Sequence, residues 1–121
     1  MVLSSAEVRA YCLDLPDACE DNPFGRSPEV CTFNVAGKVF VLTRLAAPPP
    51  LQISLKCDPQ TAVGLRSVYP AIVAGYHLNK RYWNTVTIDD SISDDLVRDM
   101  IQDSWDLVVD KLSKQQRIRL R

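Results

Sequence analysis

The chain has 121 residues, of which 46% are hydrophobic and 24% are charged, and its net charge is −1 at pH 7. This composition fits one globular domain with its own core and requires neither disorder nor internal repeats. No apolar run reaches the roughly 20 residues that span a bilayer, and the N-terminus lacks the basic and apolar regions of a signal peptide. We therefore expect a cytoplasmic protein without a membrane partner.

The first predicted element is a helix over about residues 5–13. Ser4 and Glu7 form an S-x-x-E capping box ahead of apolar residues at helical spacing, and Pro16 ends the pattern. Residues 17–28 contain two X-Pro pairs and a glycine, which favour a loop with at most a short extended piece.

Strands follow in the middle of the chain. Two β-rich runs, residues 30–35 and 38–43, flank the pair Ala36-Gly37, which is the pattern of a hairpin with a two-residue turn. Three prolines at 48–50 cannot donate hydrogen bonds to a sheet and indicate a loop. Residues 51–56 alternate between apolar and polar side chains, so we expect a third strand with one face in solvent.

A second helix and a second hairpin come next. Asp58-Pro59 is an N-cap with proline at the first helical position, and the helical spacing lasts until Pro70. Residues 71–73 and 82–88 are then predicted strands, and Asn79-Lys80 is a plausible turn between them.

The last predicted helix begins after Ser91 or Ser93 and carries apolar side chains at core-facing spacing. Its apolar positions are Leu96, Val97, Met100, Ile101, Leu107, Val108 and Leu112. Aspartates occupy the other side, at positions Asp95, Asp99, Asp103, Asp106 and Asp110. The order of these elements favours an α+β fold in which helices cover one face of an antiparallel sheet.

Charge is distributed unevenly along the chain. Five cations and no acid follow residue 110: Lys111, Lys114, Arg117, Arg119 and Arg121. The preceding residues hold nine cations against fifteen acids, a net charge of −6. A body of this charge repels DNA at long range, so contact with nucleic acid requires a local basic patch, the basic tail or both. Cations at a helix end also complement the helix dipole, so the tail alone does not indicate DNA.

Catalytic and metal-binding motifs are scarce. The chain has one histidine and no G-x-S-x-G elbow, and its four glycines match neither a P-loop nor a dinucleotide-binding fingerprint. An enzyme would need a dyad of His77 with Asp89 or Asp90, and no further partner is evident. The four cysteines form no C-x-x-C pair, and the aspartates fit a solvated helix face. We expect no catalysis, metal or cofactor.

One segment, residues 75–88, gathers the only histidine, two adjacent cations, two side-chain amides and three aromatic rings. The side chains concerned are Tyr76, His77, Asn79, Lys80, Arg81, Tyr82, Trp83 and Asn84. Cations attract anions, amides form hydrogen bonds and rings stack, so this mixture suits an anion or a nucleic acid. For two of these residues a structural role stays open. His77 can be a hydrogen-bond donor within the protein instead of a ligand contact, and Trp83 can be a covered side chain instead of an exposed stacking platform.

Six stretches together point to a family: Asn22-Pro23-Phe24-Gly25, Val35-Ala36-Gly37-Lys38-Val39-Phe40, Leu55-Lys56-Cys57-Asp58-Pro59, Tyr69-Pro70, the run from Gly75 to Val86, and Ser104-Trp105-Asp106-Leu107-Val108. With them the chain resembles the bacterial YjbR/MmcQ-like proteins over nearly its whole length. The resemblance implies one domain over residues 1–112 with a frataxin-like (CyaY-like) α+β fold, followed by a basic tail over 113–121. It also implies DNA binding through two protruding hairpins, a double wing.

Carried onto this chain, the wings would be the hairpin around Ala36-Gly37-Lys38 and the segment 76–83. The candidate nucleic-acid or anion contacts are then Lys38, Lys56, Tyr76, His77, Asn79, Lys80, Arg81, Trp83 and Asn84. The alternative is a small protein-interaction or anion-binding module, with the same cluster as its pocket and the acidic last helix as a docking face for a basic partner. In both readings we expect a monomer.

Overall fold

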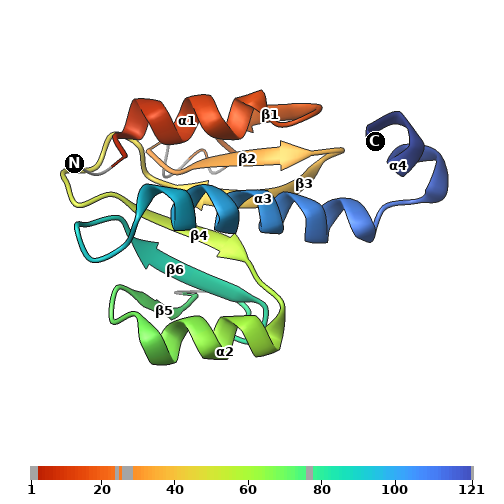
Figure 1. Ribbon diagram of the computed structural model, residues 1–121. Coiled ribbons are helices and arrows are strands. Elements are labelled where there is room, and N and C mark those ends of the chain that lie inside the picture. Colours follow the sequence, from red (N-terminus) through yellow and green to blue (C-terminus); the bar gives the residue numbers. More distant parts are fainter. Residues whose placement is uncertain (1–2, 24, 26–28, 76–77, 121) are drawn as a thin grey trace.

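The computed structural model describes residues 3–23, 25, 29–75 and 78–120 (Figure 1). Its elements are α1 (Ser5–Asp14), β1 (Ala18–Asp21), β2 (Cys31–Val35), β3 (Lys38–Thr43), β4 (Gln52–Lys56), α2 (Pro59–Val68), β5 (Ile72–Ala74), β6 (Trp83–Thr87), α3 (Asp94–Asp110) and α4 (Lys114–Leu120). Within the described residues the strands form an antiparallel sheet in the order β1-β2-β3-β4-β6-β5. Helices α1, α2 and α3 lie on the same face of the sheet (Figure 1). The predicted α+β fold, with one face covered by helices, is confirmed.

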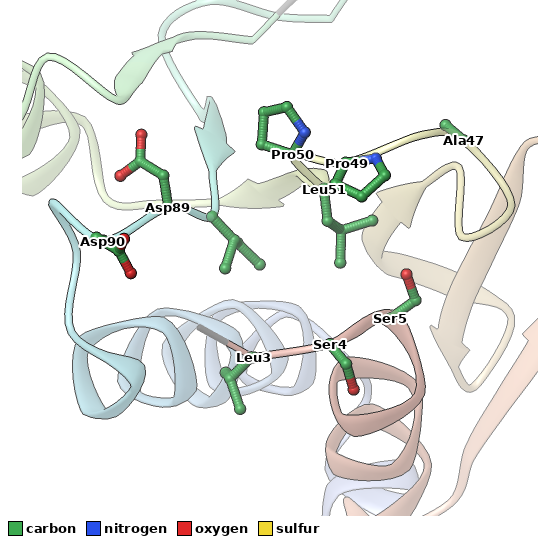
Figure 2. Close-up of a pocket in the computed structure, with 10 residues that line it drawn as sticks. Leu3, Ser4, Ser5, Ala47, Pro49, Pro50, Leu51, Asp89 and Asp90 are labelled. Atoms are coloured by element: carbon green, nitrogen blue, oxygen red, sulfur yellow. The ribbon is translucent and has the colours of Figure 1, made fainter. Parts of the chain in front are cut away.

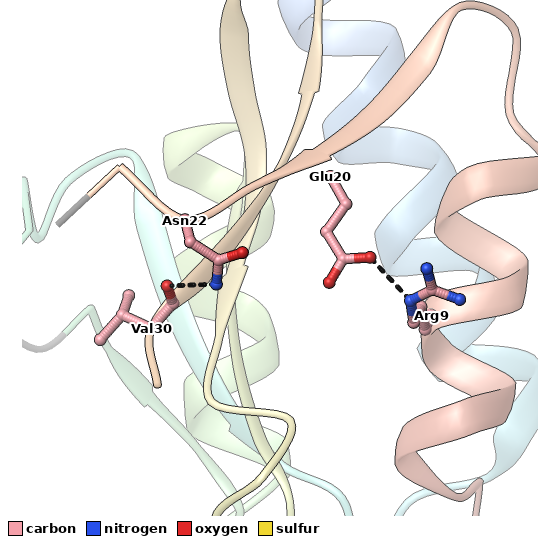
Figure 3. Close-up of polar contacts among 4 residues, drawn as sticks. All are labelled: Arg9, Glu20, Asn22 and Val30. Carbon is pink, nitrogen blue, oxygen red and sulfur yellow. Dashed lines mark hydrogen bonds and ion pairs between the residues drawn. The ribbon is translucent and has the colours of Figure 1, made fainter. Parts of the chain in front are cut away.

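Helix α1 begins where the capping box predicts. Ser4 Oγ accepts a hydrogen bond from the Glu7 N–H at 3.1 Å, and Glu7 Oε1 accepts one from the Ser4 N–H at 3.0 Å. Arg9 then forms an ion pair with Glu20 of β1, with 2.7 Å between Nε and Oε1 (Figure 3). This contact joins the helix to the edge strand of the sheet.

Strand β1 corrects the expectation of a loop over residues 17–28. Ala18–Asp21 pairs with β2, so the short extended piece allowed by the sequence is an edge strand. Asn22 Nδ2 donates a hydrogen bond to the carbonyl of Val30 at 3.2 Å (Figure 3). This bond holds together the two ends of the connection between β1 and β2.

The hairpin predicted about Ala36-Gly37 is confirmed. Val35 pairs with Lys38, and the two turn residues have φ angles of 50° and 76°. Two successive positive φ angles are typical of the type I′ turn, whose twist matches that of antiparallel strands. The turn leaves Lys38 exposed at the first position of β3.

Strand β4 follows the predicted alternation with one correction. Ile53 and Leu55 are buried under the helices, and Gln52 is exposed, as expected. Ser54 was expected in solvent but is only 7% exposed, and its hydroxyl is 2.8 Å from the hydroxyl of Thr85 in β6. The two hydroxyls form a hydrogen bond with one another across the strands. The face of β4 that points away from the helices is therefore not exposed to solvent along its whole length.

Ser104 joins α3 to two strands at once. Its buried Oγ donates a hydrogen bond to the Phe40 carbonyl at 2.6 Å and accepts one from the Lys56 N–H at 2.8 Å. The pairing of β3 with β4 ends at Val41 and Leu55, so Phe40 and Lys56 are the first residues beyond the paired part of the two strands. The Ser104 hydroxyl therefore supplies hydrogen bonds to a carbonyl and an N–H that have no partner in the neighbouring strand.

Trp105 fixes the same helix to the other half of the molecule. Its side chain is 3% exposed, and Nε1 donates a hydrogen bond to the carbonyl of Pro16 at 3.1 Å. Because Pro16 follows α1, two adjacent side chains of α3 connect it to the sheet and to the first helix. The position of α3 over the sheet is therefore set by directional bonds as well as by its apolar face.

The described part of the C-terminal segment, which the sequence presents only as a basic tail, is helical. Lys111 ends α3, and residues 114–120 form the separate helix α4. Arg117 Nη1 donates to the Asp110 carbonyl at 3.4 Å, and Leu112 and Leu120 pack against the core. The basic segment is thus folded back onto the end of α3.

Replacing Ser104 with alanine should lower the free energy of unfolding by about 2 kcal/mol, because a buried carbonyl and a backbone N–H lose their partner. Denaturant unfolding followed by circular dichroism measures the loss. Ser67→Ala is the matched control, since its hydroxyl also donates to a carbonyl, that of Gly64, but on an exposed helix surface. We expect a change of about 0.5 kcal/mol or less there. An equal loss in the two variants would contradict the bridging role of Ser104.

Candidate nucleic-acid interface

The cations named from the sequence come together at one end of the sheet. The β2–β3 turn, the end of β4, the start of β6 and the C-terminal end of α3 all lie there, on the right of Figure 1. Lys56, the last residue of β4, pairs with Trp83, the first residue of β6. We call this surface the basic end and define it by five cations: Lys38, Lys56, Lys80, Arg81 and Lys111.

Two lysines of the basic end lie close enough to Lys56 to disfavour its positive charge. Burial lowers the pKa of Lys56 below the ordinary value for lysine, and the positive charges of Lys111 and then Lys38 lower it further. Because Lys111 and Lys38 disfavour the charged form of Lys56, an anion placed beside Lys56 would relieve the repulsion. The arrangement therefore favours binding of a negatively charged ligand.

Tyr82 connects cations from two parts of the basic end. The Arg81 guanidinium carbon lies 5.6 Å from the centroid of the Tyr82 ring, and Lys111 Nζ lies 5.5 Å from it. Both distances are within the range of cation–π attraction. Tyr82 is 36% exposed, so it offers part of its surface to a ligand.

No carboxylate among the described residues neutralises the basic end. The side chains of its five cations form neither an ion pair nor a hydrogen bond within residues 3–23, 25, 29–75 and 78–120. The ion pairs Arg9–Glu20 and Arg98–Asp95 use cations outside this surface. As far as the described residues are concerned, the charges of the basic end are therefore available to a ligand.

The two asparagines serve the protein's own structure, and for Asn84 the prediction of a ligand contact is wrong. Asn84 is fully buried because it faces the helices, where Oδ1 accepts from Arg66 Nη1 at 2.7 Å and Nδ2 donates to the Ala62 carbonyl at 3.4 Å. Asn79 is exposed, but its Oδ1 accepts the Arg81 N–H at 3.0 Å. Its backbone carbonyl also accepts the N–H of Trp83 at 3.0 Å. The predicted turn at Asn79 is confirmed.

Trp83 is partly buried. This is intermediate between the covered side chain and the exposed stacking platform that the sequence left open. Gly75 packs against it, and a Cβ atom at position 75 would lie 2.8 Å from the Trp83 Cβ. The Gly75 N–H also donates to the Trp83 carbonyl at 2.8 Å. The contact with Gly75 thus holds Trp83 in place, and Trp83 is only partly exposed to solvent.

The remaining predicted contacts have different outcomes. Lys38, Lys80 and Arg81 are exposed, as a phosphate contact requires, and Lys56 is partly buried. Tyr76 and His77 lie outside the described residues, so their predicted contacts stay predictions.

Two residues missed by sequence reasoning belong to this site. Lys111 was grouped with the other C-terminal cations, and Arg66 lies in the second predicted helix, where no pattern marks it. Arg66 donates through Nη1 to Asn84 and also to the Lys80 carbonyl, at 3.5 Å. With Arg81 it lines a hollow of about 450 Å³ whose other walls are Pro59, Gln60 and Val63. No local pattern marks such a pair of arginines, because 15 positions of the printed sequence separate them.

A second hollow, of about 640 Å³, lies at the other end of the sheet (Figure 2). Its lining residues are Leu3, Ser4, Ser5, Ala47, Pro49, Pro50, Leu51, Ile88, Asp89 and Asp90. The Ser4 hydroxyl is used to cap α1, and Asp89 accepts hydrogen bonds from Ser91, which lower the pKa of Asp89. Because two of its polar side chains are already hydrogen-bonded within the protein, the hollow offers a ligand mainly apolar surface. It is separate from the basic end.

Neither metal-binding clusters nor membrane-crossing helices occur among the described residues. No three histidine, cysteine or acidic side chains gather there in a way that would hold a metal ion. None of the described helices combines the length and the apolar character needed to cross a bilayer. The cysteines are free thiols, and burial raises the pKa of Cys12 to about 12, which keeps that thiol protonated and unreactive at neutral pH.

Comparison with known proteins identifies the family. The family model of YjbR matches residues 13–107. The chain belongs to the YjbR family. The resemblance seen in the sequence is thereby confirmed.

Relatives and solved structures agree with this assignment. YbdF of Escherichia coli O157:H7 is 44% identical over 113 residues, which cover 93% of this chain and 90% of that protein. YjbR of Escherichia coli strain K12 is 25% identical over 115 residues, 95% of each chain. The crystal structure of Deinococcus radiodurans protein DR2400, with the domain DUF419, has a TM-score of 0.87 and 35% identity over 97% of this chain and 87% of that one. A Pseudomonas syringae crystal structure shares the fold, with a TM-score of 0.73 and 23% identity over 87% of this chain and 98% of that one.

The names of YbdF and YjbR describe both as uncharacterized proteins. They support the family and the fold of this chain but supply no ligand. What this YjbR-family protein binds has to be inferred from its own side chains.

Gly75→Ala should destabilise the fold by about 2 kcal/mol, because the added methyl group would overlap the side chain of Trp83. Gly64→Ala is the control and should stabilise it by about 0.5 to 1 kcal/mol, since the added Cβ meets nothing within 4 Å and the residue lies inside α2. Denaturant unfolding of the two variants should therefore give changes of opposite sign. A stabilised Gly75→Ala variant would contradict the close packing at Trp83.

Lys111→Gln should raise the pKa of Lys56 toward the ordinary lysine value, because one of the two charges that disfavour its protonated form is removed. An NMR titration of the lysine side-chain signals measures this pKa. Lys114→Gln is the control, since Lys114 is not among the charges that lower it. If the pKa of Lys56 were the same in Lys111→Gln and in the original protein, these lysines would not form a cluster.

Proposed function

We propose that this YjbR-family protein binds DNA through its phosphates, with the basic end as the contact surface, and that it acts by binding rather than by catalysis. The observation that carries the proposal is a group of cations at one end of the sheet that has no carboxylate partner among the described residues. Within this group, burial and then the positive charges of Lys111 and Lys38 lower the pKa of Lys56. Phosphate groups along a nucleic-acid strand supply the repeated negative charges that such a surface requires.

The shape of the basic end supports the same ligand. Two turns border it: the hairpin turn that precedes Lys38, and the connection between β5 and β6 that carries Lys80 and Arg81. Exposed cations on two turns at the same end of the sheet can follow a phosphate backbone, and the partly exposed Tyr82 adds a surface for stacking.

The negative charge of the rest of the molecule restricts how DNA can approach. The exposed carboxylates of Asp95, Asp99 and Asp103 on α3 repel a phosphate backbone. Attraction is therefore confined to the basic end, which orients the protein on the DNA. Because phosphate contacts release counterions, binding should weaken steeply as salt rises.

A small anion is the second candidate ligand. The hollow lined by Arg66 and Arg81 favours it, because a concave site suits a compact ligand better than an extended strand. The two ligands are not exclusive, since the hollow adjoins the basic end through Arg81.

Fluorescence anisotropy with a labelled duplex at several salt concentrations tests the proposal. The logarithm of affinity should fall with the logarithm of salt concentration, with a slope of about −0.9 per neutralised phosphate. Lys56→Gln and Lys111→Gln should each weaken binding and reduce the size of the slope by about one.

Arg44→Gln is the matched control, because Arg44 is an exposed cation that follows β3 at the other end of the sheet. It should leave affinity and slope nearly unchanged. Affinity no tighter than millimolar at low salt, or an equal loss in Arg44→Gln and Lys56→Gln, would rule out the basic end as a DNA-binding surface.

A further inference from the structure

The hollow beside the basic end differs from the rest of that surface in being concave and in having two arginines in its wall. Its volume is about 450 Å³, and Arg66 and Arg81 are its only charged lining residues among those described. Pro59, Gln60 and Val63 complete the lining and bring no carboxylate. The nearby Asp58 is already engaged, since its carboxylate accepts the backbone N–H groups of Gln60 and Thr61 at the start of α2.

Arg66 is held in position by the protein. Its Nη1 donates to the Asn84 side chain at 2.7 Å and lies 3.5 Å from the Lys80 carbonyl. Asn84 is itself fully buried and bonded to the Ala62 carbonyl. These contacts fix one corner of the guanidinium and leave Nε and Nη2 without a partner among the described residues. A fixed guanidinium with two free donors is suited to bidentate binding of an anion.

Arg81 supplies the second positive charge from the opposite element. It belongs to the β5–β6 connection, whereas Arg66 belongs to α2, and the Lys80 carbonyl that Arg66 contacts is adjacent to Arg81 in the chain. Arg81 is exposed, and its guanidinium lies near the Tyr82 ring. Two positive charges therefore meet in a site that no described carboxylate lines.

This charge and shape distinguish between two kinds of phosphate. A phosphodiester inside a strand carries one negative charge and is flanked by sugar on both sides, so it suits the open basic end. A phosphomonoester carries nearly two negative charges at pH 7 and has a free end that can enter a hollow. Val63, which is 58% exposed, and Pro59 provide an apolar wall for the group attached to that phosphate.

We propose that the hollow between Arg66 and Arg81 binds a phosphomonoester, as the 5′-phosphate at the end of a nucleic-acid strand or as a free nucleoside 5′-monophosphate. The first source rests on the proposed function, whereas the phosphomonoester chemistry does not. With a nucleic acid, the hollow holds the strand end while the lysines of the basic end contact the phosphodiesters that follow.

Two measurements on the full chain test the proposal. Isothermal titration calorimetry compares adenosine 5′-monophosphate with adenosine, and anisotropy compares single-stranded oligonucleotides that end in a 5′-phosphate or a 5′-hydroxyl. We expect saturable binding of the monophosphate only, and about tenfold tighter binding of the phosphorylated oligonucleotide.

The variants separate this hollow from the basic end. Arg66→Lys keeps the charge but removes the bidentate fork, and Arg81→Gln removes an exposed charge without touching the buried network. Each should abolish the preference for the 5′-phosphate, and Arg81→Gln tests the site even if Arg66→Lys unfolds. Because Arg81 also belongs to the basic end, Arg81→Gln should in addition weaken the binding of both oligonucleotides. Lys56→Gln should weaken both oligonucleotides equally and keep the preference, and Arg44→Gln should change neither affinity.

The outcomes distinguish the two proposals. Equal affinity for the two oligonucleotides, with no binding of the monophosphate, would overturn the phosphomonoester site and leave DNA binding standing. Binding of the monophosphate with no binding of either oligonucleotide would support the site, with the free nucleotide as its source, and overturn the proposed function. A preference for the 5′-phosphate that survives both Arg66→Lys and Arg81→Gln would overturn the location of the site.

Discussion

The hydroxyl of Ser104 is the contact on which the arrangement of the basic end depends. It binds the Phe40 carbonyl and the Lys56 N–H where β3 and β4 stop pairing, so it fixes the end of β4 and the axial position of α3 together. Lys111 follows Ser104 by seven residues, which is two helical turns, and therefore lies on the same side of the helix axis. This one bridge brings a lysine of the helix toward a lysine of the sheet.

The charges at this end work against the fold that assembles them. Burial disfavours the positive charge of Lys56, and the charges of Lys111 and Lys38 disfavour it further. Directional bonds of Ser104, Trp105 and the turns hold the lysines in place against this repulsion. Surfaces that retain an unfavourable cluster of charges are frequently functional sites, because a ligand of opposite charge removes the cost.

Local signals were enough to predict most of the elements, but not strand β1, helix α4 or the contacts between elements. The capping box at Ser4, the positive φ angles at Ala36-Gly37 and the N-cap at Asp58 each depend on neighbouring residues, and the sequence shows them directly. Contacts that span longer separations were missed: Ser104 reaches partners 48 and 64 residues away, and Arg66 reaches Asn84 over 18. Asn84 was misread because its polar side chain was given more weight than the alternation of the strand, which places it on the same face as the buried Val86 and Ile88. The cations of the site were largely found, whereas the groups that hold them in place were not.

The central claim is that the crowded lysines contact nucleic-acid phosphates, and NMR spectroscopy of the isotope-labelled protein tests it most directly. A short duplex is added at low salt while the side-chain signals of Lys38, Lys56 and Lys111 are followed, with Arg44 as the internal reference. We predict shifts of the lysine signals that saturate with DNA and disappear at high salt, while the Arg44 signal stays in place. Saturable DNA binding that leaves the three lysine signals unchanged, or no binding at low salt, would contradict the account.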